Sequence, residues 1–297
     1  MAAAELIFDG QHGTGESPVW VPDQHTLYWV DIPAKRVWSW AASSGRTRSW
    51  LLPEMVACIA HIDGQRWVAG LENGVFEVSL SSSDDSVNIS QLSAARHASD
   101  RMRFNDGRCD RQGRFLAGTM YLDMAAAKPV GAVSSFAGDV SQRLLLDGMI
   151  VPNGMAFSPD GATMYLSDSH PTIATVWAFD YDQHSGTPTN RRTFIAKGEM
   201  SGRPDGAAVD ADGCYWICGN DAGFVHRFTP EGKLDRSLAV PVKKPAMCAF
   251  GGEDLATLFV TSIRPGGVDL SDQPLAGGVF ALRPGVRGLP EPKFRLA

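Results

Sequence analysis

The sequence NGMAFSPDGATMYLSD, residues 153–168, contains two short β-rich runs separated by the turn Pro159-Asp160-Gly161. We expect a strand over Gly154–Ser158, a second over Thr163–Asp168 and, after a loop, a third over Thr175–Asp180. The pattern recurs at DGAAVDADGCYWIC, residues 205–218, where Asp212-Gly213 is the turn. Two successive copies of one strand-turn-strand unit predict an all-β protein built from repeats.

Copies of the first turn lie along the whole chain, near Gln24, Gly64, Gly113, Gly161, Gly213 and Asp254, and the four besides Gly161 and Gly213 are weaker. Their spacing of about 40 to 50 residues is typical of four-stranded propeller blades. Six turns therefore predict a six-bladed β-propeller that forms one domain over residues 1–297. The segment Glu5–Asp9 has no blade of its own, so we expect it to pair with the C-terminal strands and close the ring, which removes open sheet edges. A β-sandwich or two separate β domains are the alternatives.

Composition excludes several classes of function. The net charge is −6 and no run of Lys and Arg forms a basic stripe, so nucleic acid is not expected as a partner. No apolar stretch approaches the ~20 residues of a membrane helix, and Met1–Gly10 lacks the basic start of a signal peptide. The five irregularly spaced cysteines are expected to be small buried thiols in a reducing cytoplasm, not a zinc cluster. We expect a cytoplasmic monomer.

At one equivalent position, four of the six repeats carry a side chain with a carboxylate or carboxamide oxygen. Eight residues before the six turns stand Glu16, Val56, Asn105, Asn153, Asp205 and Ala246. We expect this position just before the first strand of each blade, which lines the central channel, so that its side chains form a ring at one depth. Carboxylate and amide oxygens suit a hard cation such as Ca²⁺, Mg²⁺ or Mn²⁺. Asn-Gly and Asp-Gly also form tight turns, but a second turn follows each pair closely and Glu16 has no turn chemistry.

Two further residues are candidates for substrate contact. Arg103 lies two positions before Asn105, so along an extended segment both side chains point the same way. Its guanidinium could hold substrate oxygens by paired hydrogen bonds; a structural ion pair is the alternative. Asp123 could reach the channel mouth or be a solvated loop residue. No Ser-His-Asp arrangement is evident, and surface or packing roles are expected for His61, His170 and His226.

Several motifs follow one another in a specific order along nearly the whole chain. They are GESPVW at 15–20, RFNDG at 103–107, AGTM at 117–120, NG at 153–154, PDG at 204–206, CAFGG at 248–252 and AGGVF at 276–280. In order and spacing they resemble the family of gluconolactonase, regucalcin (senescence marker protein) and luciferin-regenerating enzyme.

The resemblance implies a six-bladed propeller with one divalent metal ion held by Glu16, Asn153 and Asp205. It also implies that Arg103 and Asn105 bind substrate hydroxyls, and Asp123 is the nearest match to a family acidic residue after the AGTM segment. The ion could be Ca²⁺, Zn²⁺, Mn²⁺, Mg²⁺ or Fe²⁺.

The expected activity is metal-dependent hydrolysis of a small sugar lactone to the aldonic acid. Asp205 is expected to act as the general base as well as a ligand, although a metal-bound hydroxide could be the base instead. Two alternatives stay open: another propeller hydrolase, acting on phosphotriesters or aryl lactones, and a non-enzymatic calcium-binding propeller. The sequence does not identify the sugar or the ring size of the lactone.

Overall fold

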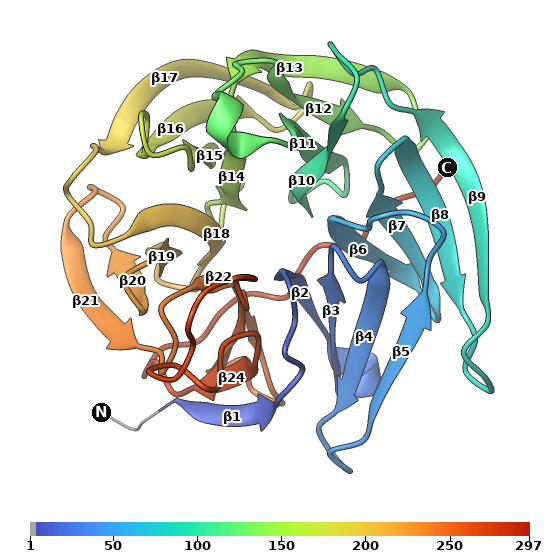
Figure 1. The fold of residues 1–297 in the computed structure, drawn as a ribbon. Coiled ribbons are helices and arrows are strands. Elements are labelled where there is room, and N and C mark those ends of the chain that lie inside the picture. Colours follow the sequence, from blue (N-terminus) through green and yellow to red (C-terminus); the bar gives the residue numbers. More distant parts are fainter. Residues whose placement is uncertain (1–3) are drawn as a thin grey trace.

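Six four-stranded sheets are arranged in a ring around a central axis in the computed structural model, which describes residues 4–297 (Figure 1). The predicted six-bladed β-propeller is confirmed. Met1–Ala3, which belong to the expected 1–297 domain and to the Met1–Gly10 stretch, lie outside the described residues.

Each blade consists of antiparallel strands, and in blades 1 to 5 these follow the chain from the channel outward. Blade 1 contains β2 (Gly15–Val21), β3 (Thr26–Asp31), β4 (Arg36–Ala41) and β5 (Thr47–Leu51); blade 2 contains β6 (Cys58–Asp63), β7 (Arg66–Gly70), β8 (Gly74–Leu80) and β9 (Val87–Ala94). Blade 3 contains β10 (Met102–Cys109), β11 (Phe115–Tyr121), β12 (Gly131–Phe136) and β13 (Gln142–Met149); blade 4 contains β14 (Pro152–Phe157), β15 (Thr163–Asp168), β16 (Thr175–Asp182) and β17 (Thr187–Ile195). Blade 5 contains β18 (Arg203–Val209), β19 (Tyr215–Asn220), β20 (Phe224–Phe228) and β21 (Leu234–Ala239), and blade 6 contains β22 (Pro245–Gly251), β23 (Thr257–Ser262) and β24 (Val279–Leu282).

The ring closes through the N-terminal strand. Strand β1 (Glu5–Phe8) pairs antiparallel with β24, with Glu5 opposite Ala281 and Leu6 opposite Phe280. The two ends of the repeat array therefore share one sheet, as predicted. Closure hydrogen-bonds the outer edge of blade 6 and joins it covalently to blade 1.

The predicted first turns are the hairpins between the first and second strands of the blades. In blade 5, the buried Asp210 carboxylate organises this hairpin: Oδ1 accepts the N–H groups of Asp212 and Cys214, and Oδ2 accepts Trp216 Nε1 and Arg227 Nε, at 2.8–3.0 Å. Gly213 completes the turn with φ +84°. Side-chain capping of this kind explains why Asp and Gly recur at these points.

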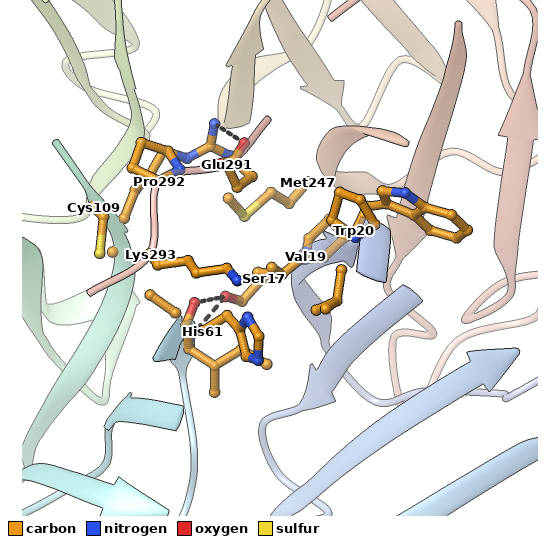
Figure 2. Close-up of a pocket in the computed structure, with 16 residues that line it drawn as sticks. Ser17, Val19, Trp20, His61, Cys109, Met247, Glu291, Pro292 and Lys293 are labelled. Atoms are coloured by element: carbon orange, nitrogen blue, oxygen red, sulfur yellow. Dashed lines mark hydrogen bonds and ion pairs between the residues drawn. The ribbon is translucent and has the colours of Figure 1, made fainter. Parts of the chain in front are cut away.

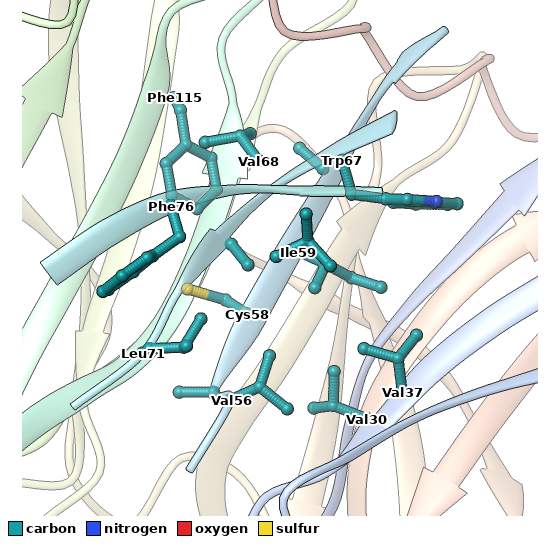
Figure 3. Packing of buried hydrophobic residues seen from close by; sticks show 14 of the residues in the cluster. Val30, Val37, Val56, Cys58, Ile59, Trp67, Val68, Leu71, Phe76 and Phe115 are labelled. Atoms are coloured by element: carbon teal, nitrogen blue, oxygen red, sulfur yellow. The ribbon is translucent and has the colours of Figure 1, made fainter. Parts of the chain in front are cut away.

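Apolar side chains fill the space between neighbouring blades. Figure 3 shows the cluster at the junction of blades 1, 2 and 3, where Val30, Ile59, Trp67, Val68 and Phe115 are each at most 2% exposed. Burying a side chain of this size contributes about 1.5–3 kcal/mol relative to leaving it in water. The inner strands are therefore held in fixed positions around the channel.

The last residues cross the ring at the end of the channel where the inner strands finish, drawn as the red segment running to the C-terminus in Figure 1. We call residues 286–297 the C-terminal strap. It pairs with blade 5 at Gly288–Asp210, and it donates backbone hydrogen bonds from Phe294 to His61 O in blade 2 and from Arg295 to Gly113 O in blade 3. The strap thus links blades that are not neighbours.

Two expectations from composition can be compared with the structure. Cys58, Cys109, Cys214, Cys218 and Cys248 are all buried and free, as predicted. Within residues 4–297, none of the helices has the length and apolar character needed to cross a membrane.

Candidate active site

The predicted channel residues lie inside the inner strands, not just before them. Glu16 is in β2, Asn105 in β10, Asn153 in β14 and Asp205 in β18. The expected placement outside the strands was therefore wrong, because strand pairing continues on both sides of each residue. Only Val56, of blade 2, precedes its strand.

An irregularity in strand register explains how residues inside a strand can point into the channel. The pairing shifts between Glu16 and Val19, Phe104 and Gly107, Asn153 and Ala156, Pro204 and Ala207, and Pro245 and Cys248. A bulge of this kind bends the strand and re-aims its side chains. The repeat therefore places the same local distortion in five of the six described blades, and in four of them it carries a polar side chain: Glu16, Asn105, Asn153 and Asp205.

In two of these bulges, the residue that follows Glu16 or Asn153 has a left-handed backbone conformation: φ is +52° at Ser17 and +64° at Gly154. At Gly154 a Cβ atom would lie 2.6 Å from Tyr215 Oη, and this hydroxyl donates a hydrogen bond to Gly154 O at 2.7 Å. Both the backbone angle and the close approach therefore require glycine. The Asn153-Gly154 pair serves the bulge, not a hairpin turn.

A chain of hydrogen bonds joins three blades at the channel. Arg103 Nη1 donates to Asn105 Oδ1 at 2.9 Å, and Asn105 Nδ2 donates to Asn153 Oδ1 at 3.2 Å. Asn153 Nδ2 then donates to Asp205 Oδ1 at 2.8 Å. Residues 48 and 52 positions apart in sequence are thus in direct contact. Arg103 also donates to Phe104 O, and neither of these partners is a carboxylate.

Glu16 faces this group from blade 1. Burial raises the pKa of the Glu16 carboxyl well above its usual range, and the negative charges of Asp205 and Asp106 raise it further, while Arg103 opposes them. Burial likewise raises the pKa of Asp205 to about 7, against the charge of Arg203 and a hydrogen bond from Asn220. Two carboxylates therefore share a desolvated site and repel each other.

The donor set fits a hard divalent cation. It offers two carboxylates and a carboxamide, and the Asn153 oxygen keeps a second lone pair besides the one engaged by Asn105. A cation between Glu16 and Asp205 would offset the cost of burying two like charges. In the part of the chain that the structure describes, no three His, Cys, Asp or Glu side chains gather as a metal site; the predicted set includes only two residues of these types.

The structure does not bring Asp123 into this group. Asp123 is exposed and stands immediately before the 3₁₀ helix η2 (Met124–Ala126). Nearby, the Tyr121 ring is faced by Lys128 Nζ at 4.0 Å. A contact between Asp123 and substrate stays a prediction.

Two polar residues of the site were missed by the sequence interpretation. Asn220, at the end of β19, donates from Nδ2 to Asp205 Oδ2 at 2.6 Å. Asp106 is buried and accepts the N–H of Met155 through Oδ2 at 2.9 Å, while its Oδ1 has no partner among the described residues. Asp106 stands within the RFNDG motif, whereas Asn220 follows no turn or repeat signal.

A small cavity lies on the channel axis between the inner strands and the C-terminal strap (Figure 2). Its volume is about 30 Å³, and its lining includes Ser17, His61, Cys109, Met247 and Glu291. Arg108 and Glu291 form an ion pair at 3.0 Å beside it. The strap therefore covers this end of the channel, opposite the end that carries Glu16 and Asp205.

The metal-free protein is expected to lose stability relative to an Asp205→Asn variant as the pH rises from about 4 to 7. The Asp205 pKa is raised from 3.8 to about 7, so the folded protein binds this proton more tightly than the unfolded chain. The stabilisation is complete below the unfolded pKa and disappears as pH rises through the folded one. Melting temperatures of both proteins in EDTA would test this. Parallel pH profiles would contradict it.

Comparisons with known proteins give a consistent result. The family model described as "SMP-30/Gluconolactonase/LRE-like region" matches residues 14–264. The chain is 36% identical over 282 residues to a 6-deoxy-6-sulfogluconolactonase of Pseudomonas putida, with 94% of each chain covered. It is 35% identical over 284 residues to regucalcin of Sus scrofa, with 93% of each covered. The crystal structure of a calcium-binding protein, regucalcin, from Agrobacterium tumefaciens has a TM-score of 0.90 at 27% identity, covering 99% of this chain and 98% of that one.

Proposed function

Because this chain belongs to the SMP-30/gluconolactonase/LRE-like family, we propose that it hydrolyses a small sugar lactone to the aldonic acid with one bound divalent metal ion. The observation that carries the proposal is the contact of Asn153 with Asp205 across two blades, at 2.8 Å, in a channel that also holds the desolvated carboxyl of Glu16. These three residues would hold the ion.

The channel residues have different roles in the proposed hydrolysis. Glu16, Asn153 and Asp205 would hold the divalent cation, which would supply Lewis-acid chemistry at the lactone carbonyl and favour negative charge on its oxygen. Asp205 accepts the proton of the attacking water through a carboxylate oxygen. The remaining hydroxide adds to the carbonyl carbon, the ring ester bond breaks, and Asp205 returns the proton to the leaving ring oxygen, which leaves a carboxylic acid and a hydroxyl group.

Arg103 and Asn105 orient the substrate. Arg103 Nη1 is engaged by Phe104 O and Asn105 Oδ1, and a guanidinium has five N–H donors, so donors remain for sugar oxygens. Holding the ring hydroxyls fixes the carbonyl relative to the attacking water. Asp123 is proposed as a further substrate contact from the channel mouth, where its exposed carboxylate can accept hydroxyl donors.

The proposal also covers the cellular compartment, the oligomeric state and the partners of the protein. The buried free thiols of the described chain suit a reducing compartment such as the cytoplasm. We propose a monomer that acts on a small molecule, with no nucleic acid or membrane as partner, in line with its net charge of −6.

A panel of lactones tests the function. Purified protein stripped of metal would be reconstituted with Ca²⁺, Mg²⁺, Mn²⁺, Zn²⁺ or Fe²⁺ in turn and assayed by proton release on glucono-, galactono-, xylono- and arabinonolactone. A sulfonated gluconolactone belongs in the panel because of the Pseudomonas putida relative. Turnover of at least one sugar lactone supports the proposal; turnover of phosphotriesters or aryl lactones alone would replace it with another hydrolase.

Chelation is expected to abolish turnover. EDTA removes the proposed ion, leaves the Glu16 and Asp205 carboxylates uncompensated, and takes away the Lewis acid. Activity should fall at least about 100-fold and return when a divalent ion is added in excess. An active chelated enzyme would contradict metal dependence, and bound calcium with no turnover on any ester would favour a calcium-binding propeller.

A further inference from the structure

Both oxygens of the Asp205 carboxylate are held by side-chain amides. Asn153 Nδ2 donates to Oδ1 at 2.8 Å, and Asn220 Nδ2 donates to Oδ2 at 2.6 Å. Asn153 belongs to the proposed ligand set, whereas Asn220 comes from the end of β19 and is 1% exposed. Strand pairing explains its position, since Asn220 stands opposite Arg203 at the start of β18.

The other end of the Asn220 amide determines which way the group is oriented. Asn220 Oδ1 accepts from Arg203 Nη2 at 3.3 Å and from Lys244 Nζ at 3.4 Å. Two cationic donors can face only the amide oxygen, so the NH₂ group must face Asp205. The two cations are in turn held by Asp221, through Arg203 Nε at 2.6 Å and through Lys244 Nζ.

We infer that Asn220 is the positioning residue of Asp205: it fixes the plane of the carboxylate and directs its free lone pairs toward the channel. This inference rests on the proposed function, in which Asp205 is both ligand and base. Asn153 alone leaves the carboxylate free to rotate about one hydrogen bond, whereas two donors on opposite oxygens define its plane. Arg203, Lys244 and Asp221 act through Asn220 by keeping its NH₂ group turned inward. Supporting residues of this kind typically contribute 10- to 100-fold to metal affinity or activity.

Three variants with uncharged side chains distinguish a positioning role of Asn220 from a packing role. Asn220→Leu keeps the branched shape and the number of side-chain heavy atoms, with a somewhat larger volume, and removes the donor. Asn220→Ser keeps a shorter donor, and the control Asn73→Ala alters an exposed asparagine in the turn between β7 and β8. We expect Asn220→Leu to weaken the binding of Mn²⁺, measured by titration calorimetry, about 10- to 100-fold. At saturating Mn²⁺ its kcat should fall by a similar factor with KM within about twofold, and the control should match the wild type.

The rank order of the variants in Mn²⁺ affinity and kcat distinguishes a positioning role of Asn220 from a packing role. Positioning predicts wild type, then Asn220→Ser, then Asn220→Leu in both Mn²⁺ affinity and kcat, whereas a packing role predicts that Leu, which fills the space, performs at least as well as Ser. Wild-type affinity and kcat in Asn220→Ser and Asn220→Leu would overturn the inference, and if Asn220→Leu fails to fold, wild-type values in Asn220→Ser alone would do so. If the wild-type protein binds Mn²⁺ but turns over no lactone, the proposed function is wrong. The Mn²⁺ affinities of the Asn220 variants then still test whether Asn220 positions Asp205.

Discussion

Replacing Asp205 with asparagine is expected to lower kcat for lactone hydrolysis about 100- to 10,000-fold, the usual contribution of a general base. Asparagine has nearly the same shape but cannot accept the proton of the attacking water. It also removes one of the two negative charges available to the cation, so the affinity for the metal should fall as well. Asn153 and Asn220 now donate to opposite oxygens of the carboxylate, so in the variant one of them would face the new NH₂ group instead of an acceptor.

The measurement is steady-state kinetics at saturating metal, with metal content determined on the same samples. Asp147→Asn is the matched control, because Asp147 is exposed on β13, the outermost strand of blade 3, and this variant should keep wild-type activity. An Asp205→Asn protein that is fully active would remove Asp205 from the mechanism. Full activity with reduced metal affinity would leave it a ligand only.

Shortening Phe294 to alanine is expected to reduce the free energy of unfolding by about 3–5 kcal/mol. Phe294 is 2% exposed, although it lies only three residues before the C-terminal Ala297 in the C-terminal strap. Its ring packs edge-on against Phe115, 6.5 Å between centroids, and its N–H bonds to His61 O at 2.8 Å. It therefore anchors the strap to blades 2 and 3 at once.

Urea unfolding of Phe294→Ala and of Lys293→Ala would test this role. The Lys293 side chain is 49% exposed and its ion pair with Asp23 spans 3.3 Å, so its loss should cost no more than about 0.5 kcal/mol. Equal stability of the two variants would show that the strap is not part of the cooperative fold. A large loss in Phe294→Ala alone would show that the strap stabilises the ring at the end opposite the site.

The repeat pattern predicted the fold because each blade repeats its own turn chemistry. The hairpin of blade 5 shows this well, since Asp210 and Gly213 serve that turn through contacts within a few residues. Local contacts of this kind are visible in a single sequence. The same alignment also brought Asn153 and Asp205 to equivalent places, and in the structure they are hydrogen-bonded.

Other features depend on contacts that no local pattern records. The bulges that carry Glu16 and Asn153 place these residues within the strands, because a bulge leaves pairing intact on both sides and only the register reveals it. Asn220 reaches Asp205 through the pairing of β19 with β18, which a repeat alignment on first turns does not examine. The strap belongs to no repeat, so the spacing of turns says nothing about where it runs.

The most direct test of the metal centre is anomalous diffraction from crystals of the protein grown with Mn²⁺. The account predicts one strong anomalous peak per chain in the channel, about 2.0–2.6 Å from oxygens of Glu16, Asn153 and Asp205, the usual range for hard cations. Glu16→Gln crystals should show a weaker peak or none. A channel without a peak, or a peak that lies away from these three side chains, would contradict the account.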